Sequence, residues 1–143
     1  MLSLDTNILL YAYDSQCKEH LAALDFVRAQ ATNPDFAICE LVLVELYVLL
    51  RNPAVVAHPL SAKDAVEVVQ AYRVNRNWAV IECADGVMHE VWRLARAYDF
   101  GRRQVFDSRL ALTLRRHGVR AFATRNVTHF DGFGFDRVWD PLA

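Results

Sequence analysis

The sequence lacks several features that define whole classes of protein. No apolar run approaches the about 18 residues that a membrane-spanning helix needs. The apolar start of the chain has no basic segment before it and is interrupted by Asp5, unlike a secretory signal. No internal repeat or low-complexity tract is present. We therefore expect a cytoplasmic protein with a single domain, residues 1–143.

Cysteine is scarce, and the histidines are scattered. The three cysteines, Cys17, Cys39 and Cys83, form no C-x-x-C pair, which favours reduced and mostly buried thiols over disulfides. The five histidines show no paired spacing of the kind that zinc sites use, so zinc is a poor candidate. Hydrophobic residues make up 54% of the chain and charged residues 23%, the composition of a globular protein.

The charges are distributed unevenly along the chain. Nine arginines and three acids lie between positions 89 and 125, a local charge of +6, whereas six basic residues and eleven acids in the first 88 positions give −5. A segment dominated by arginine suits bidentate contacts to phosphate and indicates an anionic partner. The alternative is a helix pair with a solvated arginine face, and charge alone does not decide between the two.

The apolar pattern alternates between short runs and longer helical stretches. Short runs predict strands at residues 1–5, 35–40, 78–83 and 119–124, with a fifth at 136–140. Helical spacing and capping residues predict helices at residues 6–14, 18–32, 41–52, 61–76, 86–101 and 104–118. This alternation indicates an α/β fold with a parallel sheet. Ligands of such folds bind outside the carboxyl ends of the strands.

Two polar residues follow predicted strands at that edge. Asp5 comes after the first strand, where it either caps the next helix or holds a metal ion. Asn126 follows the fourth strand, where asparagine often makes a local side-chain turn instead. Read singly, each residue has an ordinary structural explanation.

Two acids occupy unusual helical positions. Glu45 shares a predicted face with Leu41, Val42 and Val48, and burying a carboxylate there is costly unless it is paired or binds a cation. The alternatives are a buried ion pair with arginine or a solvent-facing position. Asp107 lies in the first turn of the helix at 104–118, on the face that carries Leu110 and Leu114, although an acid there usually compensates the helix dipole. Together with Asp5 and Asn126, these acids provide the hard oxygen ligands that suit Mg²⁺ or Mn²⁺.

Four ordered motifs carry a family resemblance. "LDTN" at 4–7, "VLVEL" at 42–46, "VFDSRLA" at 105–111 and "FATRN" at 122–126 resemble the PIN-domain nucleases, and more closely the VapC toxin ribonucleases of toxin–antitoxin pairs. The resemblance spans nearly the whole chain. It implies a PIN-like three-layer sandwich whose central, mostly parallel sheet has four to five strands. It also implies a metal-dependent endoribonuclease, a VapB-type antitoxin, an RNA substrate such as transfer or ribosomal RNA, and a homodimer.

The resemblance also implies roles for particular residues. Asp5 and Asp107 would bind Mg²⁺ or Mn²⁺ directly, whereas Glu45 would hold a metal-bound water or a second ion. Asn126 stands where relatives often have aspartate and would orient a ligand or water. His129 is expected to pack at the strand–loop junction and not to be a ligand. Candidate supporting residues are Thr6, Asn7, Ser108 and Thr124, and candidate RNA-binding residues are Arg102, Arg103 and Arg125.

Two other functions fit parts of the pattern. A PIN-like module that binds RNA without cutting it is compatible with Asn126, which cannot supply a negative charge. A phosphoryl-accepting α/β domain also has an aspartate after its first strand. Such a domain needs a neighbouring acid and a lysine after a late strand, but "LDTN" holds one acid and the two lysines are Lys18 and Lys63.

Overall fold

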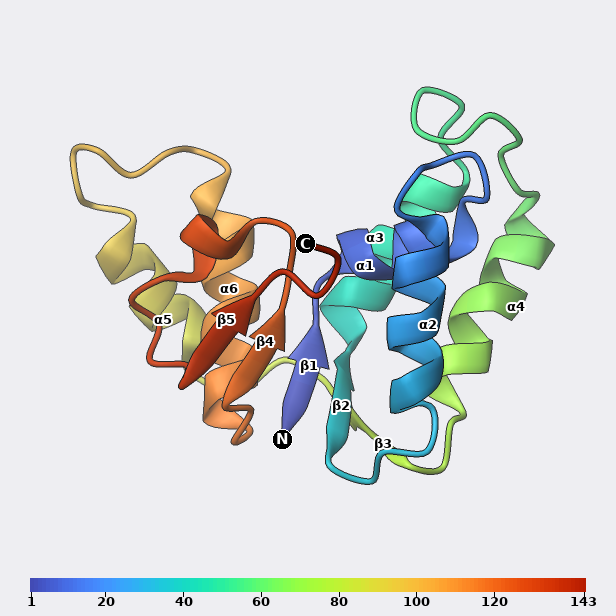
Figure 1. The fold of residues 1–143 in the computed structure, drawn as a ribbon. Coiled ribbons are helices and arrows are strands. Elements are labelled where there is room, and N and C mark those ends of the chain that lie inside the picture. Colours follow the sequence, from blue (N-terminus) through green and yellow to red (C-terminus); the bar gives the residue numbers. More distant parts are fainter.

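The computed structural model describes all of residues 1–143 and contains one five-stranded sheet with helices on both faces (Figure 1). The strands are β1 (Leu2–Leu4), β2 (Phe36–Cys39), β3 (Trp78–Ile81), β4 (Ala121–Ala123) and β5 (Arg137–Trp139). The helices are α1 (Thr6–Tyr13), α2 (His20–Gln30), α3 (Glu40–Leu50), α4 (Ala62–Arg73), α5 (Val87–Leu94), α6 (Gln104–Arg116) and the 3-10 helix η1 (Val127–Phe130). The alternation predicted from the sequence is confirmed.

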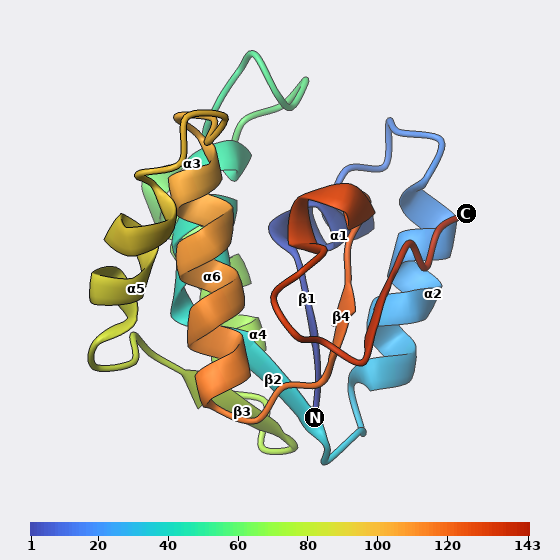
Figure 2. The same cartoon turned by 90° about the vertical axis from the view of Figure 1, so that its left-hand side faces the viewer.

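The sheet is entirely parallel, with the strand order β3-β2-β1-β4-β5. The chain adds β2 and β3 on one side of β1 and then crosses back to add β4 and β5 on the other. Since such crossovers are right-handed, the reversal places α1–α4 on one face and α5 and α6 on the opposite face (Figures 1 and 2). The result is the predicted three-layer sandwich, with its reversal point between β1 and β4.

Apolar side chains from the central strands and their helices form the core. Leu4 and Phe122 are completely buried, as are Ile8 and Leu9 of α1. The ring of Phe122 lies 4.7 Å from that of Phe130 in η1, centroid to centroid, which anchors the segment after β4. The buried ends of β1 and β4 therefore hold the residues that follow them in fixed positions.

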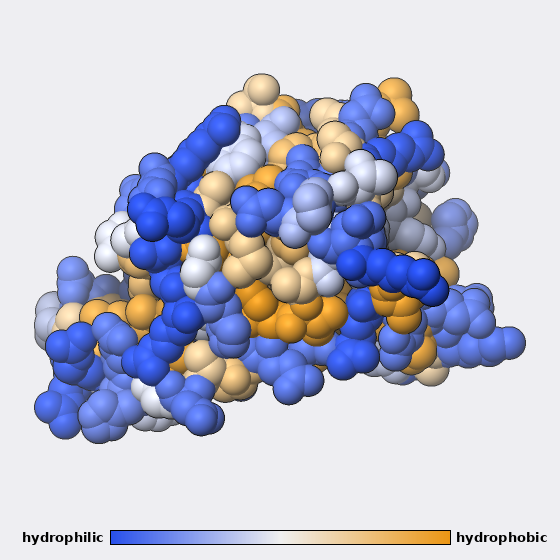
Figure 3. Space-filling view, turned by 90° about the horizontal axis from the view of Figure 1, so that it is seen from below, coloured by the Kyte–Doolittle hydropathy of each residue, from blue (hydrophilic) through white to orange (hydrophobic).

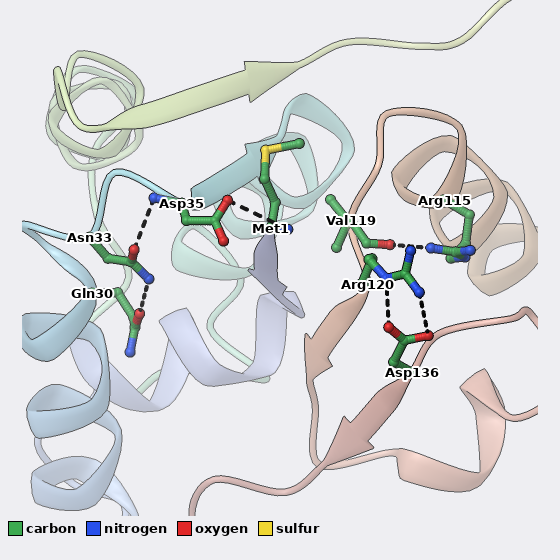
Figure 4. A network of polar contacts seen from close by, with 8 residues as sticks. All are labelled: Met1, Gln30, Asn33, Asp35, Arg115, Val119, Arg120 and Asp136. Carbon is green, nitrogen blue, oxygen red and sulfur yellow. Dashed lines mark hydrogen bonds and ion pairs between the residues drawn. The ribbon is translucent and has the colours of Figure 1, made fainter.

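Polar contacts fix the amino-terminal edge of the sheet (Figure 4). The Met1 ammonium lies 3.6 Å from Asp35, just before β2, and the Arg120 guanidinium lies 2.6 Å from Asp136, just before β5. Because these pairs are exposed, each contributes little stability, but together they align the starts of neighbouring strands. Seen from this end, the surface is mainly hydrophilic around a central apolar patch (Figure 3). The predicted site residues lie at the opposite edge.

The predicted helix at 86–101 is too long, because α5 ends at Leu94. Residues 95–103 form an irregular connection that projects beyond the carboxyl edge of the sheet (Figure 1). Arg96, Tyr98 and Asp99 are all exposed there, so no apolar face is buried to support further helical turns. None of the helices has the length and hydrophobicity of a membrane-spanning segment.

Helix α4 begins with a side-chain cap that can be tested. The Ser61 hydroxyl accepts a hydrogen bond from the backbone N–H of Asp64 at 3.1 Å. Replacing Ser61 with alanine leaves that donor without its cap and should lower the free energy of unfolding by about 1 kcal/mol. Ser61→Asp should retain most of the stability because aspartate is also a good cap. Urea denaturation of the three proteins would measure the difference, and equal stability of the alanine variant would contradict the assignment.

Candidate active site

Asp5 lies at the carboxyl end of β1, in the middle of the sheet. Its side chain accepts a hydrogen bond from the Thr6 backbone N–H at 2.8 Å, so Asp5 is the N-cap of α1. The other carboxylate oxygen accepts a hydrogen bond from the Thr124 hydroxyl at 2.7 Å, and Thr124 directly follows β4. Asp5 is only 8% exposed. The cap and the site position are therefore two functions of one side chain, and not alternatives.

The electrostatic environment of Asp5 disfavours its charged form. Burial raises its pKa from 3.8 to about 6, against the opposing effect of the hydrogen bonds from Thr124 and Thr6. The carboxylates of Glu45 and Asp107 also raise the pKa of Asp5. Asp5 after β1, Glu45 of α3 and Asp107 of α6 are thus close enough to influence one another electrostatically. A cation bound among them would relieve this repulsion.

Glu45 is exposed, which is the solvent-facing alternative that the sequence left open. Helix α3 directs Val42, Leu43, Leu46 and Leu50 into the core, which leaves Glu45 at the surface. The Thr6 hydroxyl donates a hydrogen bond to the Glu45 carboxylate at 3.0 Å. Since Thr6 also follows Asp5 directly, this contact connects the two acids.

Asp107 lies in the first turn of α6 and its side chain is 33% exposed. Burial raises its pKa, whereas His129 and Arg103 lower it. The Nδ1 atom of His129 lies 3.3 Å from the Asp107 carboxylate, and the His129 side chain is 57% exposed. The expectation that His129 packs at the strand–loop junction is therefore wrong. The adjacent Phe130 fills the core instead, and this turns His129 towards α6.

Thr6, Asn7 and Thr124, three of the four candidate supporting residues, have polar atoms within 3.5 Å of the Asp5 carboxylate. Asn126 is exposed and its backbone N–H donates to the Thr124 hydroxyl at 3.0 Å, so Thr124, and not the Asn126 side chain, forms the turn after β4. The Asn7 amide nitrogen lies 3.5 Å from the Asp5 carboxylate. The side-chain oxygen of Asn7 is buried without a hydrogen-bond partner. That oxygen is an unused acceptor beside the acids.

The donor set fits a hard divalent cation. Asp5, Glu45, Asp107 and the Asn7 carbonyl all offer oxygen ligands. No three histidine, cysteine, aspartate or glutamate side chains converge closely enough to form a complete metal cage. Mg²⁺ does not require one, because it usually retains several waters and binds one or two carboxylates together with substrate phosphates.

The three candidate RNA-binding arginines differ in their surroundings. Arg102 and Arg103 are exposed in the connection before α6 and form no ion pair within the chain. Arg125 lies 3.2 Å from Asp140 and 3.9 Å from Glu19, so it is held in intramolecular ion pairs. The structure thus leaves Arg102 and Arg103 free for an anionic ligand and commits Arg125 to its neighbours.

A buried aspartate at the reversal point of a parallel sheet, surrounded by two further acids, defines an α/β protein with an acidic site. The PIN domain family model matches residues 2–133, and the chain belongs to the PIN-domain family. Within that family it is VapC-like. It is 58% identical over 142 residues to Ribonuclease VapC24 of Mycobacterium tuberculosis, a match that covers 99% of this chain and 97% of that protein.

Solved structures agree with this family at the level of the fold. Mycobacterium tuberculosis VapC20, described as a sarcin–ricin loop cleaving toxin, superposes with a TM-score of 0.65 at 15% identity, over 85% of this chain and 87% of that chain. FitAcB of Neisseria gonorrhoeae gives 0.64 at 18% identity, covering 99% and 98%. FitAB bound to a DNA fragment gives 0.64 at 16% identity, covering 100% and 96%. The family match removes the phosphoryl-accepting alternative.

Proposed function

We propose that this chain is a VapC-type toxin that cleaves RNA phosphodiesters with the help of Mg²⁺ or Mn²⁺. The observation that carries the proposal is the buried Asp5 carboxylate, whose pKa is raised in part by Glu45 and Asp107. The 58% identical relative is a ribonuclease, and the identity extends over nearly the whole chain. The acidic edge of the sheet is the place where the phosphate would bind.

Each site residue has a separate task in this proposal. Asp5 and Asp107 would hold the cation, and Glu45 would hold a water molecule at its periphery. When bound, the cation would supply a water of lowered pKa and would offset charge on the scissile phosphate. Thr6 and Thr124 fix the Asp5 carboxylate through the hydrogen bonds described above, and Asn126 orients a ligand. Attack would be in line and would leave a 5′-phosphate and a 3′-hydroxyl.

The basic connection before α6 supports an RNA substrate. Arg102 and Arg103 are exposed beside the acidic edge, and Arg103 is close enough to lower the pKa of Asp107. Phosphate contacts of this kind provide most of the affinity of proteins for nucleic acids. They would draw the RNA backbone towards carboxylates that would otherwise repel it.

A direct assay tests the proposed activity. The purified chain is incubated with total bacterial RNA and Mn²⁺, with Mg²⁺, or with EDTA, and new 5′ ends are sequenced. Cleavage at defined positions with either cation, absent in EDTA, supports the proposal and identifies the RNA target. If the chain bound RNA but produced no new 5′ ends under any condition, a PIN module that does not cut RNA would be favoured instead. This is the second candidate function, because Asn126 is exposed at the site and cannot supply a negative charge.

The partner would be a VapB-type antitoxin, and the toxin itself would form a homodimer in the cytoplasm. The proposal of an antitoxin rests on the 58% identical VapC24 relative, because VapC proteins are the toxins that the sequence resembles. The solved structures FitAcB and FitAB have the same fold. Val44 and Val48 of α3 are 61% and 56% exposed, one turn apart. An apolar surface of this kind suits a protein interface.

Thr6 provides a test of how Glu45 is positioned. Thr6→Val keeps the shape of the buried side chain but removes the hydroxyl that donates to Glu45. We expect the rate of RNA cleavage to fall about tenfold, the effect of losing one hydrogen bond to a charged group. Thr6→Ser retains the hydroxyl and should stay close to wild type. Single-turnover kinetics would compare the three proteins, and an unchanged rate for Thr6→Val would show that this contact has no part in cleavage.

A further inference from the structure

A groove of about 440 Å³ lies next to the acidic site, between α5, the 95–103 connection, α6 and η1. Its walls combine apolar side chains with a few polar ones. The apolar part includes Leu94, Phe100, Leu112 and Phe133. Helices α5 and α6 lie side by side (Figures 1 and 2), and η1, which follows β4, contacts α6. The residues that contact Asp5 do not line this groove, so it is a separate feature of the surface.

The groove is continuous with the site through two residues. His129 lines it and also contacts the Asp107 carboxylate through Nδ1 at 3.3 Å. Ser108 follows Asp107 in the chain, lines the groove and is 2% exposed. A ligand in the groove would therefore lie next to the proposed metal ligand Asp107.

Charge on the rim differs from charge inside the groove. The rim connection carries Arg96, Arg102 and Arg103, which are exposed and form no ion pair within the chain, against one acid, Asp99. Inside, Asp131 presents a carboxylate without an intramolecular ion pair, whereas Glu90, the other acid of the lining, is paired with Arg93 and Arg116. Carboxylates repel a phosphate but accept hydrogen bonds from the amino groups of bases. This distribution fits a strand whose backbone follows the rim while one base enters the groove.

We propose that the groove binds one unstacked RNA base beside the cleavage position, an inference that rests on the proposed ribonuclease function. Phe100 and Phe133 provide aromatic surface for the base, and sequence-specific RNA recognition generally targets such splayed nucleotides. Asp131 favours bases that carry an amino group, namely adenine, cytosine and guanine. Uracil has no amino group and is disfavoured at this position. The groove thus contributes to the choice of the cleavage site.

A groove-filling variant tests the occupant. Ala97 is exposed and lines the groove, so Ala97→Trp occupies it at little cost to the fold. Ala71 is also exposed but lies on α4, across the sheet, so Ala71→Trp is the matched control. Binding of short fluorescent single-stranded RNAs is measured by anisotropy in EDTA, where no cleavage occurs. Ala97→Trp should weaken binding about tenfold, the loss of roughly one stacked base, and Ala71→Trp should not weaken it.

The identity of the base gives a second measurement. Asp131→Asn replaces the two acceptor oxygens of the carboxylate by one acceptor oxygen and one donor NH₂ group. Because the preference for amino-bearing bases would depend on the carboxylate, this change should abolish the wild-type preference for RNAs that contain adenine, cytosine or guanine over oligouridine. Unchanged affinity of Ala97→Trp for every RNA would overturn the proposal. If this variant bound RNA normally but no longer bound a VapB-type antitoxin, the occupant of the groove would be a protein segment. Wild type that binds RNA but never cuts it would refute only the ribonuclease function. Wild type that binds no RNA would refute both.

Discussion

Replacing Asp5 with asparagine should reduce the rate of RNA cleavage by at least about 10³-fold, because the central carboxylate of the proposed metal site is removed. The fold should survive this change. Asparagine is as good an N-cap as aspartate, and its carbonyl can still accept one of the hydrogen bonds from Thr6 or Thr124. The loss of activity can therefore be separated from a loss of structure by circular dichroism and thermal melting.

Three further variants serve as controls and comparisons for Asp5→Asn. Asp25→Asn changes the same chemical group on the exposed surface of α2 and should leave cleavage unchanged. Asp107→Asn should be as inactive as Asp5→Asn, and the double variant should be no worse than either, because residues that act as a unit show strongly non-additive effects. In cells, expression of either single variant should no longer arrest growth. If both variants remained fully toxic, the assignment of the site would be wrong.

The sheet topology explains why residues so far apart in the sequence meet. The order of the strands reverses between β1 and β4, so the ends of these two strands are neighbours although 119 positions separate Asp5 from Thr124. Helices α3 and α6 lie on opposite faces of the sheet, and each contributes an acid from a turn near this edge. Asp5 lies between them. Ligand sites at such reversal points are a general property of open α/β sheets.

The sequence predicted elements better than it predicted side-chain directions. All five strands and six helices could be recognised, because short apolar runs and helical spacing are local signals. The exposure of Glu45 could not be predicted, since α3 is apolar on almost every face and periodicity alone does not reveal which face meets the core. The contact between His129 and Asp107 depends on how η1 packs after β4. No spacing rule contains that information.

The contrast between Thr124 and Asn126 has the same origin. Asparagine after a strand favours a local side-chain turn, but the Thr124 hydroxyl binds both the Asn126 N–H and the Asp5 carboxylate. This leaves the Asn126 side chain exposed at the site. The Asn7 oxygen, buried without a partner, was equally invisible in the sequence, because an orphaned acceptor can be identified only once its neighbours are placed. Residue types could thus be predicted, but not their contacts.

Without metal, the stability of this protein should decrease as pH rises from about 4 to about 6. The pKa of Asp5 is raised from 3.8 to about 6 in the folded state, so the folded chain binds more protons than the unfolded chain between these values. The corresponding contribution is present below pH 4, is lost as pH rises through 6, and amounts to about 3 kcal/mol. Asp107 acts in the same direction, since its pKa is also raised.

The difference between wild type and Asp5→Asn isolates this effect, because other titrating groups are common to both proteins. In EDTA, the two should have similar stability at pH 4, and the variant should be more stable at pH 7.5 by up to about 3 kcal/mol, less whatever hydrogen bonding asparagine loses. Urea denaturation at both pH values measures this, with Asp25→Asn as the control. A difference that does not depend on pH would refute the raised pKa.

Adding Mn²⁺ or Mg²⁺ at pH 7.5 should then raise the melting temperature of the wild type and remove its difference in stability from Asp5→Asn. A cation that binds only the folded state stabilises it by mass action, by about 2.7 kcal/mol at a hundredfold excess over Kd. Asp5→Asn lacks the central ligand and should gain little. Since this readout does not involve RNA, it tests the oxygen-lined site independently of catalysis. A wild type that melts at the same temperature with and without the cations would argue that Asp5 is only a helix cap.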